Sequence, residues 1–313
     1  MCKKINLSNF NIGFEFEFCS PLEDLNNITF DEEQYNKYID KEIKYKIDIE
    51  HKSLSLAKIE AKNECNFNNF ILDNEENIWK RKVSFLKDSL QLEISENINT
   101  SFECVETGNS WFIKFDDDIK GKEHLLSSYK TKDYGLEIST SVYDIDSGIS
   151  ILNKVLSFIN HNGYTNYSTG LHISIDDKRY KKENQNWLKL ATLFDDIFFT
   201  KQFDRQKNIN NKSLFNFFKT INYKDYLIKN NMNYDKLEQS FKEWILKDRT
   251  YSINFQHDNY YEFRVSGGKD YETKFTNIKN NIIRFCELIE ECNSLDNEEY
   301  HRKIESLLFR NKQ

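Results

Sequence analysis

Hydrophobic and polar residues alternate with a period of two along eight short stretches, which is the pattern of strands that bury one face. These stretches are Asn11–Phe18, Lys44–Glu50, Ser53–Glu60, Trp111–Phe115, Tyr134–Thr140, Leu171–Ile175, Tyr251–Phe255 and Tyr261–Val265. Apolar residues three and four apart predict helices over Asn74–Leu92, Asp146–His161, Asn184–Lys201, Leu214–Lys229, Tyr234–Leu246, Thr273–Cys292 and Asn297–Phe309. Strands first, then strands mixed with helices, predict an α+β domain with helices packed on one face of an antiparallel sheet.

The chain shows no convincing repeat or linker, so we expect one main domain over residues 1–295 and a C-terminal helix over residues 296–313. Residues 40–62 are expected to form a hairpin insertion. The helix at Asp146 has clear boundaries, because Asp144 or Asp146 can accept its first N–H groups. Gly163 is expected to end that helix in the left-handed conformation.

Composition narrows the class of protein. Of 313 residues, 38% are hydrophobic and 15% aromatic, which excludes disorder as the main state. The net charge of −7 argues against a nucleic-acid partner and favours a small molecule, a cation or a basic surface. No apolar run has membrane-spanning length, and the N-terminus lacks the apolar core of a signal peptide. The six cysteines form no C-x-x-C pair, so we expect free thiols and a cytoplasmic location.

The polar rows of four predicted strands carry the candidate chemistry. Opposite their apolar rows, the strands IGFEFEF, GLEIST, GLHISI and YYEFRV present Glu15 and Glu17, Glu137, His172, and Glu262 with Arg264. Two like charges about 6 Å apart at an effective dielectric near 20 repel by roughly 3 kcal/mol, and a lone arginine cannot offset four neighbouring carboxylates. If the strands are neighbours, the acids must protonate, spread apart or hold cations.

Carboxylates with a single imidazole suit hard ions such as Mg²⁺ or Mn²⁺, which complete their shell with water and phosphate oxygens. This set therefore indicates a nucleoside triphosphate bridged by metal ions, with Arg264 as a bidentate phosphate clamp. The ordinary alternative is a sheet with one solvated face. A solvated strand face usually contains Lys, Thr and Ser among its polar residues, and Lys44–Glu50 partly fits this pattern. The polar rows of the four strands named above instead contain mainly acids, with one histidine and one arginine.

The order of these motifs resembles the amidoligase family, within the glutamine synthetase and glutamate–cysteine ligase group of carboxylate–amine ligases. The matching pieces are IGFEFEF (11–18), WFIKFDDD (111–118), GLEIST (135–140), STGLHISI (168–175) and RTYSINF with YEFRV (249–265). The resemblance implies a cup-shaped antiparallel sheet with helices on its outer face, ATP and Mg²⁺ as cofactors, and an acyl phosphate that an amine displaces.

The resemblance also implies roles for single residues. Metal ligands would be Glu15, Glu17, Glu137, His172 and Glu262; ATP contacts would come from Arg249, Arg264, His172 and Asn254; Arg264, Asp116 and Asp118 would act in catalysis. The family's Asp-Gly-Ser turn reads Asp116-Asp117-Asp118 here, which affects expected acceptor binding. Ser174 stands where the family has a second histidine on the G-L-H strand.

Three functions stay open on the sequence: an ATP- and Mg²⁺-dependent carboxylate–amine ligase, a phosphotransferase on the same scaffold, and a non-catalytic interaction protein with a relic ATP site. The substrates would be small-molecule or peptide carboxylates and amines. The sequence does not decide whether the protein forms rings or smaller oligomers. Three residues receive ordinary interpretations. Arg205 could reach phosphate, but we expect a solvated helix end; His257 is expected on the surface or in a loop; and Cys19 is expected to be a thiol without a catalytic role.

Overall fold

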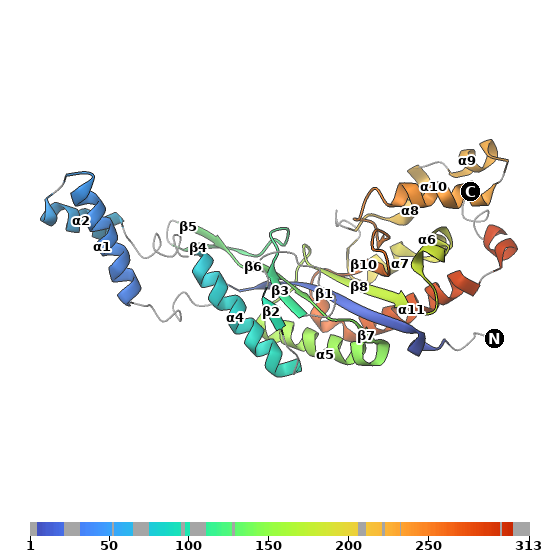
Figure 1. The fold of residues 1–313 in the computed structure, drawn as a ribbon, viewed down its shortest axis with the longest axis horizontal. Coiled ribbons are helices and arrows are strands. Elements are labelled where there is room, and N and C mark those ends of the chain that lie inside the picture. The colour runs from blue at the N-terminus through green and yellow to red at the C-terminus, as the bar shows by residue number, and fades with distance from the viewer. Residues whose placement is uncertain are drawn as a thin grey trace.

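The computed structural model describes residues 5–21, 32–51, 53–64, 75–94, 98–100, 111–126, 129–205, 211–220, 223–231, 233–294 and 296–302. Within them, eight strands form an open sheet in the order β2-β3-β6-β1-β8-β10-β9, with β7 paired to β1 (Figure 1). Their bounds are β1 (Phe10–Ser20), β2 (Ile98–Thr100), β3 (Trp111–Phe115), β6 (Tyr134–Ser139), β7 (Tyr143–Asp144), β8 (Gly170–Asp177), β9 (Ile253–Asn254) and β10 (Tyr261–Gly267). Every pairing is antiparallel except β2 with β3.

The helices follow the strands in a mixed order, which confirms the α+β class. They are α1 (Glu32–Asp48), α2 (Leu54–Glu64), α4 (Glu75–Ile94), α5 (Ile145–Asn162), α6 (Trp187–Leu193), α7 (Asp196–Gln202), α8 (Leu214–Thr220), α9 (Tyr223–Lys229), α10 (Tyr234–Ile245) and α11 (Phe275–Ser294). Short 3₁₀ helices occupy Leu7–Asn9, Lys182–Asn184 and Tyr271–Thr273, and β4 (Glu123–Leu126) pairs with β5 (Tyr129–Lys132) as a separate ribbon. None of the helices in the described ranges has the length and apolar character that a membrane span requires.

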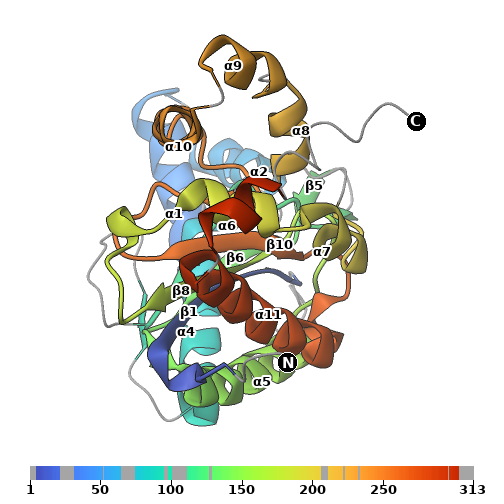
Figure 2. The same cartoon turned by 90° about the vertical axis from the view of Figure 1, so that its right-hand side faces the viewer.

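One face of the sheet is committed to the apolar core. The side chains of Phe14, Phe16, Phe18, Leu136, Ile138, Leu171, Ile173 and Phe263 are all buried there. Helices α5 and α11 cover this face, as the end-on view shows (Figure 2). The ring of Phe18 meets that of Phe158 on α5, and Phe263 stacks on Phe285 of α11 with ring centroids 4.2 Å apart. Since side chains alternate along a strand, the polar row of each strand must face the opposite side.

Helix α5 shows how local sequence fixes this packing. Asp144 is its N-cap and accepts from the Ser147 N–H at 3.0 Å. Gly148 lets the helix approach β1, because a Cβ there would lie 2.2 Å from Ile12. The expected left-handed ending at Gly163 is wrong, since its backbone is extended. Gly163 is needed instead for close approach, because a Cβ would lie 2.5 Å from the Cys19 carbonyl oxygen.

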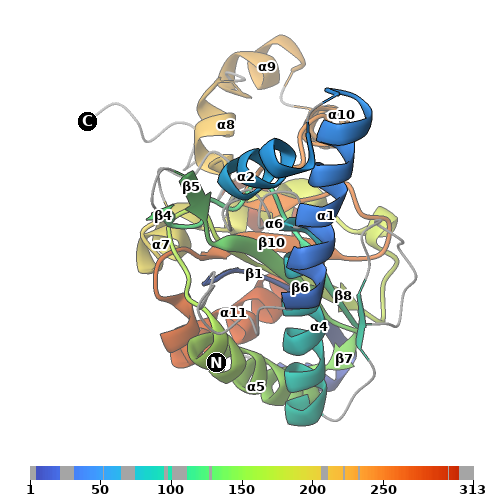
Figure 3. The same cartoon turned by 90° about the vertical axis from the view of Figure 1, so that its left-hand side faces the viewer.

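The two strands predicted between residues 40 and 62 are also wrong. Helices α1 and α2 occupy this segment and pack on each other, at the left of Figure 1 and in front in Figure 3. The buried ammonium of Lys46 lies 3.7–3.9 Å from carboxylates of Glu42, Glu50 and Glu60. Two of these partners are four residues away, which is a helical spacing that the apparent alternation concealed.

Two further helix predictions need correction, because Asn184–Lys201 and Leu214–Lys229 each contain a break. Asp195 divides the first into α6 and α7 by accepting from the Phe198 N–H at 3.0 Å as the N-cap of α7. The second divides into α8 and α9. Of the C-terminal helix, residues 297–302 are helical, and the remaining predicted residues lie outside the described ranges. Cys19, Cys286 and Cys292 are buried free thiols.

The packing of α11 on the sheet predicts a large difference between two phenylalanines. We expect Phe285→Ala to lower the free energy of unfolding by about 3–5 kcal/mol, because the ring is fully buried against Phe263. Phe198→Ala is the matched control, since that ring is 56% exposed, and it should cost less than about 1 kcal/mol. Urea unfolding measures both, and equal losses would contradict this account of the core.

Candidate active site

Strand register brings the predicted polar residues together on the face opposite the core. Glu15 on β1 pairs with His172 on β8, and Glu17 pairs with Glu137 on β6. Glu262 on β10 pairs with Ser174, two residues from His172 on the same side of β8. The four strands are consecutive neighbours in the sheet, so side chains from distant parts of the chain meet on one surface.

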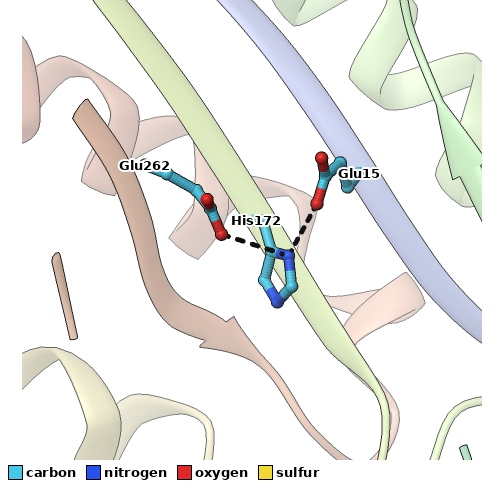
Figure 4. A group of neighbouring side chains, drawn as sticks. All are labelled: Glu15, His172 and Glu262. Atoms are coloured by element: carbon cyan, nitrogen blue, oxygen red, sulfur yellow. Dashed lines mark hydrogen bonds and ion pairs between the residues drawn. The ribbon is translucent and has the colours of Figure 1, made fainter. Parts of the chain in front are cut away.

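The first cluster joins Glu15, His172 and Glu262, which we call the histidine cluster (Figure 4). The Nδ1–H of His172 donates to Glu15 Oε2 at 2.9 Å and lies 3.4 Å from Glu262 Oε1. Its Nε2 lies 3.4 Å from Glu17 Oε1. Burial and Arg264 work to lower the pKa of His172, but the surrounding carboxylates outweigh them and raise the pKa. Burial works to raise the pKa of Glu15, and His172 outweighs it, so that pKa is lowered.

The second cluster joins Glu17, Asp116 and Glu137, which we call the carboxylate cluster. One oxygen from each carboxylate lies within 4.8 Å of the others. Glu137 accepts from Ser139 Oγ and from Lys114 Nζ, both at 2.8 Å. Burial, reinforced by the charge of Glu15, raises the pKa of Glu137 to about 6. Burial and the charge of Glu17 also raise the pKa of Asp116, although its hydrogen bond from the Asp118 N–H opposes them.

Gly170 leaves space free of side-chain atoms between Glu17, His172 and Arg205. Gly170 begins β8, and its N–H donates to Glu17 Oε2 at 2.5 Å. A Cβ at this position would lie 3.0 Å from both Glu17 Oε2 and His172 Nε2, and 3.2 Å from Arg205 Nη1. Any side chain here would therefore occupy the space that these three groups border.

More cations border the site than the sequence indicated. Lys114, in WFIKF, is not among the residues that the sequence predicted for the site. Alternation nevertheless places it on the polar face, and the strand register pairs it with Glu137. Arg264 contacts Glu262, and Arg205 is buried beside Glu17 rather than forming a solvated helix end. The expectation of a lone arginine is therefore wrong. The five carboxylates of the two clusters still outnumber these three permanent cations, which leaves an excess negative charge for divalent ions.

His257 is the residue that sequence reasoning missed most clearly. It lies in the turn between β9 and β10, and its Nε2 donates to Glu262 Oε2 at 2.6 Å. Asn254 donates to the same oxygen at 2.8 Å. Burial works to raise the pKa of Glu262, but His257, His172 and Arg264 lower it well below its usual range. The signal available in the sequence was the position of His257 in a short turn between two strands of the site.

The remaining predicted residues lie at the edge or outside. Asn254 is buried at Glu262, whereas Asp118 is exposed on the turn after β3 and contacts Asp116 through its backbone. Arg249 is exposed, four residues after the end of α10. Ser174 faces the same side as His172 and pairs with Glu262 in the ladder.

The donor sets fit divalent cations. The histidine cluster offers two carboxylates and an imidazole, and the carboxylate cluster offers three carboxylates. Oxygen-rich sets with few nitrogen ligands and no sulfur suit Mg²⁺ or Mn²⁺. His257, Asn254, Lys114 and Ser139 contact these side chains and fix their orientation, as outer-shell groups would in a metal site.

One family model matches the part of the chain that holds both clusters. The family model described as "putative amidoligase enzyme" matches residues 8–266. The chain belongs to the amidoligase family. The match runs from just before β1 to Ser266 in β10 and includes every residue of both clusters. The family description indicates that this amidoligase is a ligase-type enzyme. No curated protein and no solved structure matches the chain.

The raised pKa of Glu137 predicts a specific pH dependence of stability. Burial raises the pKa of Glu137 in the folded protein to about 6, above the ordinary glutamate value of 4.5, so the folded amidoligase binds this proton more tightly than the unfolded chain. The stabilisation of the folded state by this more tightly bound proton is fully present below about pH 4.5 and is lost as the pH rises through about 6. With chelator present, Glu137→Gln should be about 2 kcal/mol more stable than wild type at pH 7 and equal to it at pH 4.

Urea unfolding across this pH range tests the effect, with Glu298→Gln as a control on an exposed helix. The control should follow wild type throughout. A Glu137→Gln variant that also followed wild type would show that Glu137 titrates normally.

The contact between His257 and Glu262 predicts weaker metal binding when the ring is removed. We expect His257→Ala to reduce Mn²⁺ affinity by about 10-fold, because outer-shell partners typically contribute 10–100-fold. His161→Ala is the matched control, since that exposed ring contacts only Ser157 of its own helix among the described residues. Calorimetric titration with Mn²⁺ measures both, and unchanged affinity in His257→Ala would exclude this supporting role.

Proposed function

We propose that this amidoligase is an ATP- and Mg²⁺-dependent carboxylate–amine ligase that forms an amide or peptide bond through an acyl phosphate. The observation that carries the proposal is the pair of acidic clusters on one face of adjacent strands β1, β6, β8 and β10, in a chain that matches the amidoligase family. The finer fold implied by the sequence, a cup-shaped sheet like that of glutamine synthetase and glutamate–cysteine ligase, is part of this proposal.

The proposed site must bring two anions together. ATP transfers its γ-phosphoryl group to a substrate carboxylate, giving an acyl phosphate and ADP. An amine then attacks the acyl carbon, the C–O bond to phosphate breaks, and amide, inorganic phosphate and a proton are formed. Bound Mg²⁺ ions would neutralise the triphosphate and stabilise the transferring group.

Each side chain has a role that follows from its position. The histidine and carboxylate clusters would hold the ions, and Arg264 would hold phosphate oxygens through its planar guanidinium. Asn254 would act through Glu262, which it contacts directly. Asp116 would accept the proton of the amine, because burial has raised its pKa above that of an ordinary aspartate. Asp118 and Arg249 would meet substrate or phosphate only from the exposed edge.

The proposal is tested first by ligand-dependent stability. Mg²⁺ with ATP should raise the melting temperature, whereas ATP with chelator should not, because a ligand that binds only the folded state stabilises it by mass action. Absence of a metal-dependent shift would favour the non-catalytic interaction protein. Phosphate release that depends on an added amine then separates the ligase from a phosphotransferase.

Two substitutions connect the activity to the site. Glu262→Gln and Arg264→Ala should each lower amine-dependent phosphate release by about 100-fold or more, because each removes a charge that the reacting groups need. Arg284→Ala is the matched control on the exposed side of α11, where the guanidinium contacts Glu287, and it should keep full activity. Full turnover in either site variant would contradict the assignment.

A further inference from the structure

Arg205 is a buried cation that none of the proposed catalytic steps uses. It follows α7, which lies beside β10 in Figures 1 and 2, and only 3% of its surface is exposed. Its Nη1 donates to the carbonyl oxygens of Arg264, at 3.0 Å, and of Ser266. Its Nε is buried without a hydrogen-bond partner in the described part of the chain. A guanidinium is therefore held inside the protein against the backbone of a catalytic strand.

That backbone contains a β-bulge. Phe263 pairs with Ile173 and Ser266 with Leu171, so three steps along β10 match two along β8. A bulge leaves ladder groups unpaired, bends the strand and changes the direction of its side chains. The two carbonyls that accept from Arg205 belong to this irregular stretch: one is that of Arg264, two residues after Glu262, and the other is that of Ser266.

Glycines make room for the guanidinium. Gly267 and Gly268 have φ angles of +113° and +79°, which other residues rarely adopt. A Cβ on Gly268 would lie 3.2 Å from Arg205 Cγ, and one on Gly170 would lie 3.2 Å from Nη1. The Gly-Gly pair after YEFRV is thus both a turn and a close approach to Arg205.

The position of Arg205 also matters electrostatically. Burial lowers its pKa to about 10, and the charge of Glu17 opposes this shift. The side chain is therefore charged at neutral pH, within the acidic surroundings of the site. The Nη1 of Arg205 donates to backbone carbonyl oxygens, whereas the guanidinium of Arg264 contacts Glu262 in the histidine cluster.

We propose that Arg205 is a positioning residue: it holds the β10 bulge in the shape that directs Arg264 into the site. The consequence for ATP binding rests on the proposed function, whereas the consequence for strand register does not. Arg205 acts through Arg264, so removal of Arg205 should matter only while Arg264 is present.

A double-mutant cycle tests this coupling, with affinity for ATP in excess Mg²⁺ measured by calorimetry. Arg205→Met should weaken ATP binding by about 10-fold in the wild-type background and by less than about twofold in Arg264→Ala, since residues in one network are not additive. Arg205→Lys should restore affinity to within about threefold, because an ammonium can donate to both carbonyls. Arg179→Met, which removes an arginine paired with Asp177 and Glu290 away from the clusters, should bind ATP as wild type does.

Equal losses in the two backgrounds, or no rescue by Arg205→Lys, would overturn the proposal. If Arg205→Met does not fold, Arg205→Gln replaces it in the same cycle. If wild type does not bind ATP, the proposed function fails, and crystal structures of wild type and the variant decide the inference. Loss of the register shift between Phe263 and Ser266 in the variant would support it, and an unchanged bulge would overturn it.

Discussion

The repulsion among carboxylates on one face of a sheet is the constraint on which the site depends. Glu15, Glu17, Glu137 and Glu262 cannot turn away, because their neighbours along the strands are buried on the opposite face. Burial raises the cost of their charge, and its clearest mark is the raised pKa of Glu137. The apolar core thus holds the acids together, and the cations around them decide how much negative charge remains.

The structure distributes this charge unevenly. Glu262 is surrounded by His172, His257 and Arg264 and remains ionised far below neutral pH, whereas Glu137 has Lys114 as its closest cation and gains a proton near pH 6. The two clusters therefore differ in electrostatic character although they share a face. If the proposed ligase holds both a triphosphate and a second anion, such a difference would let two metal ions be held with unequal strength.

The sequence predicted the parts of the structure that depend on alternation. Strands β1, β6, β8 and β10 are confirmed, because each carries an uninterrupted apolar row opposite its polar row. Alternation failed at residues 44–60, where charges four apart form a helical pair around Lys46. It also could not indicate Arg205 or His257, since a loop residue reaches the site only through tertiary packing. The register that joins Glu15 to His172 likewise required the fold.

The most direct measurement of the central claim is anomalous X-ray scattering from a crystal grown with Mn²⁺. The account predicts manganese peaks within coordination distance of the histidine cluster (Glu15, His172 and Glu262) and of the carboxylate cluster (Glu17, Asp116 and Glu137). Manganese bound elsewhere on the molecule, with both clusters free of a peak at saturating Mn²⁺, would contradict it.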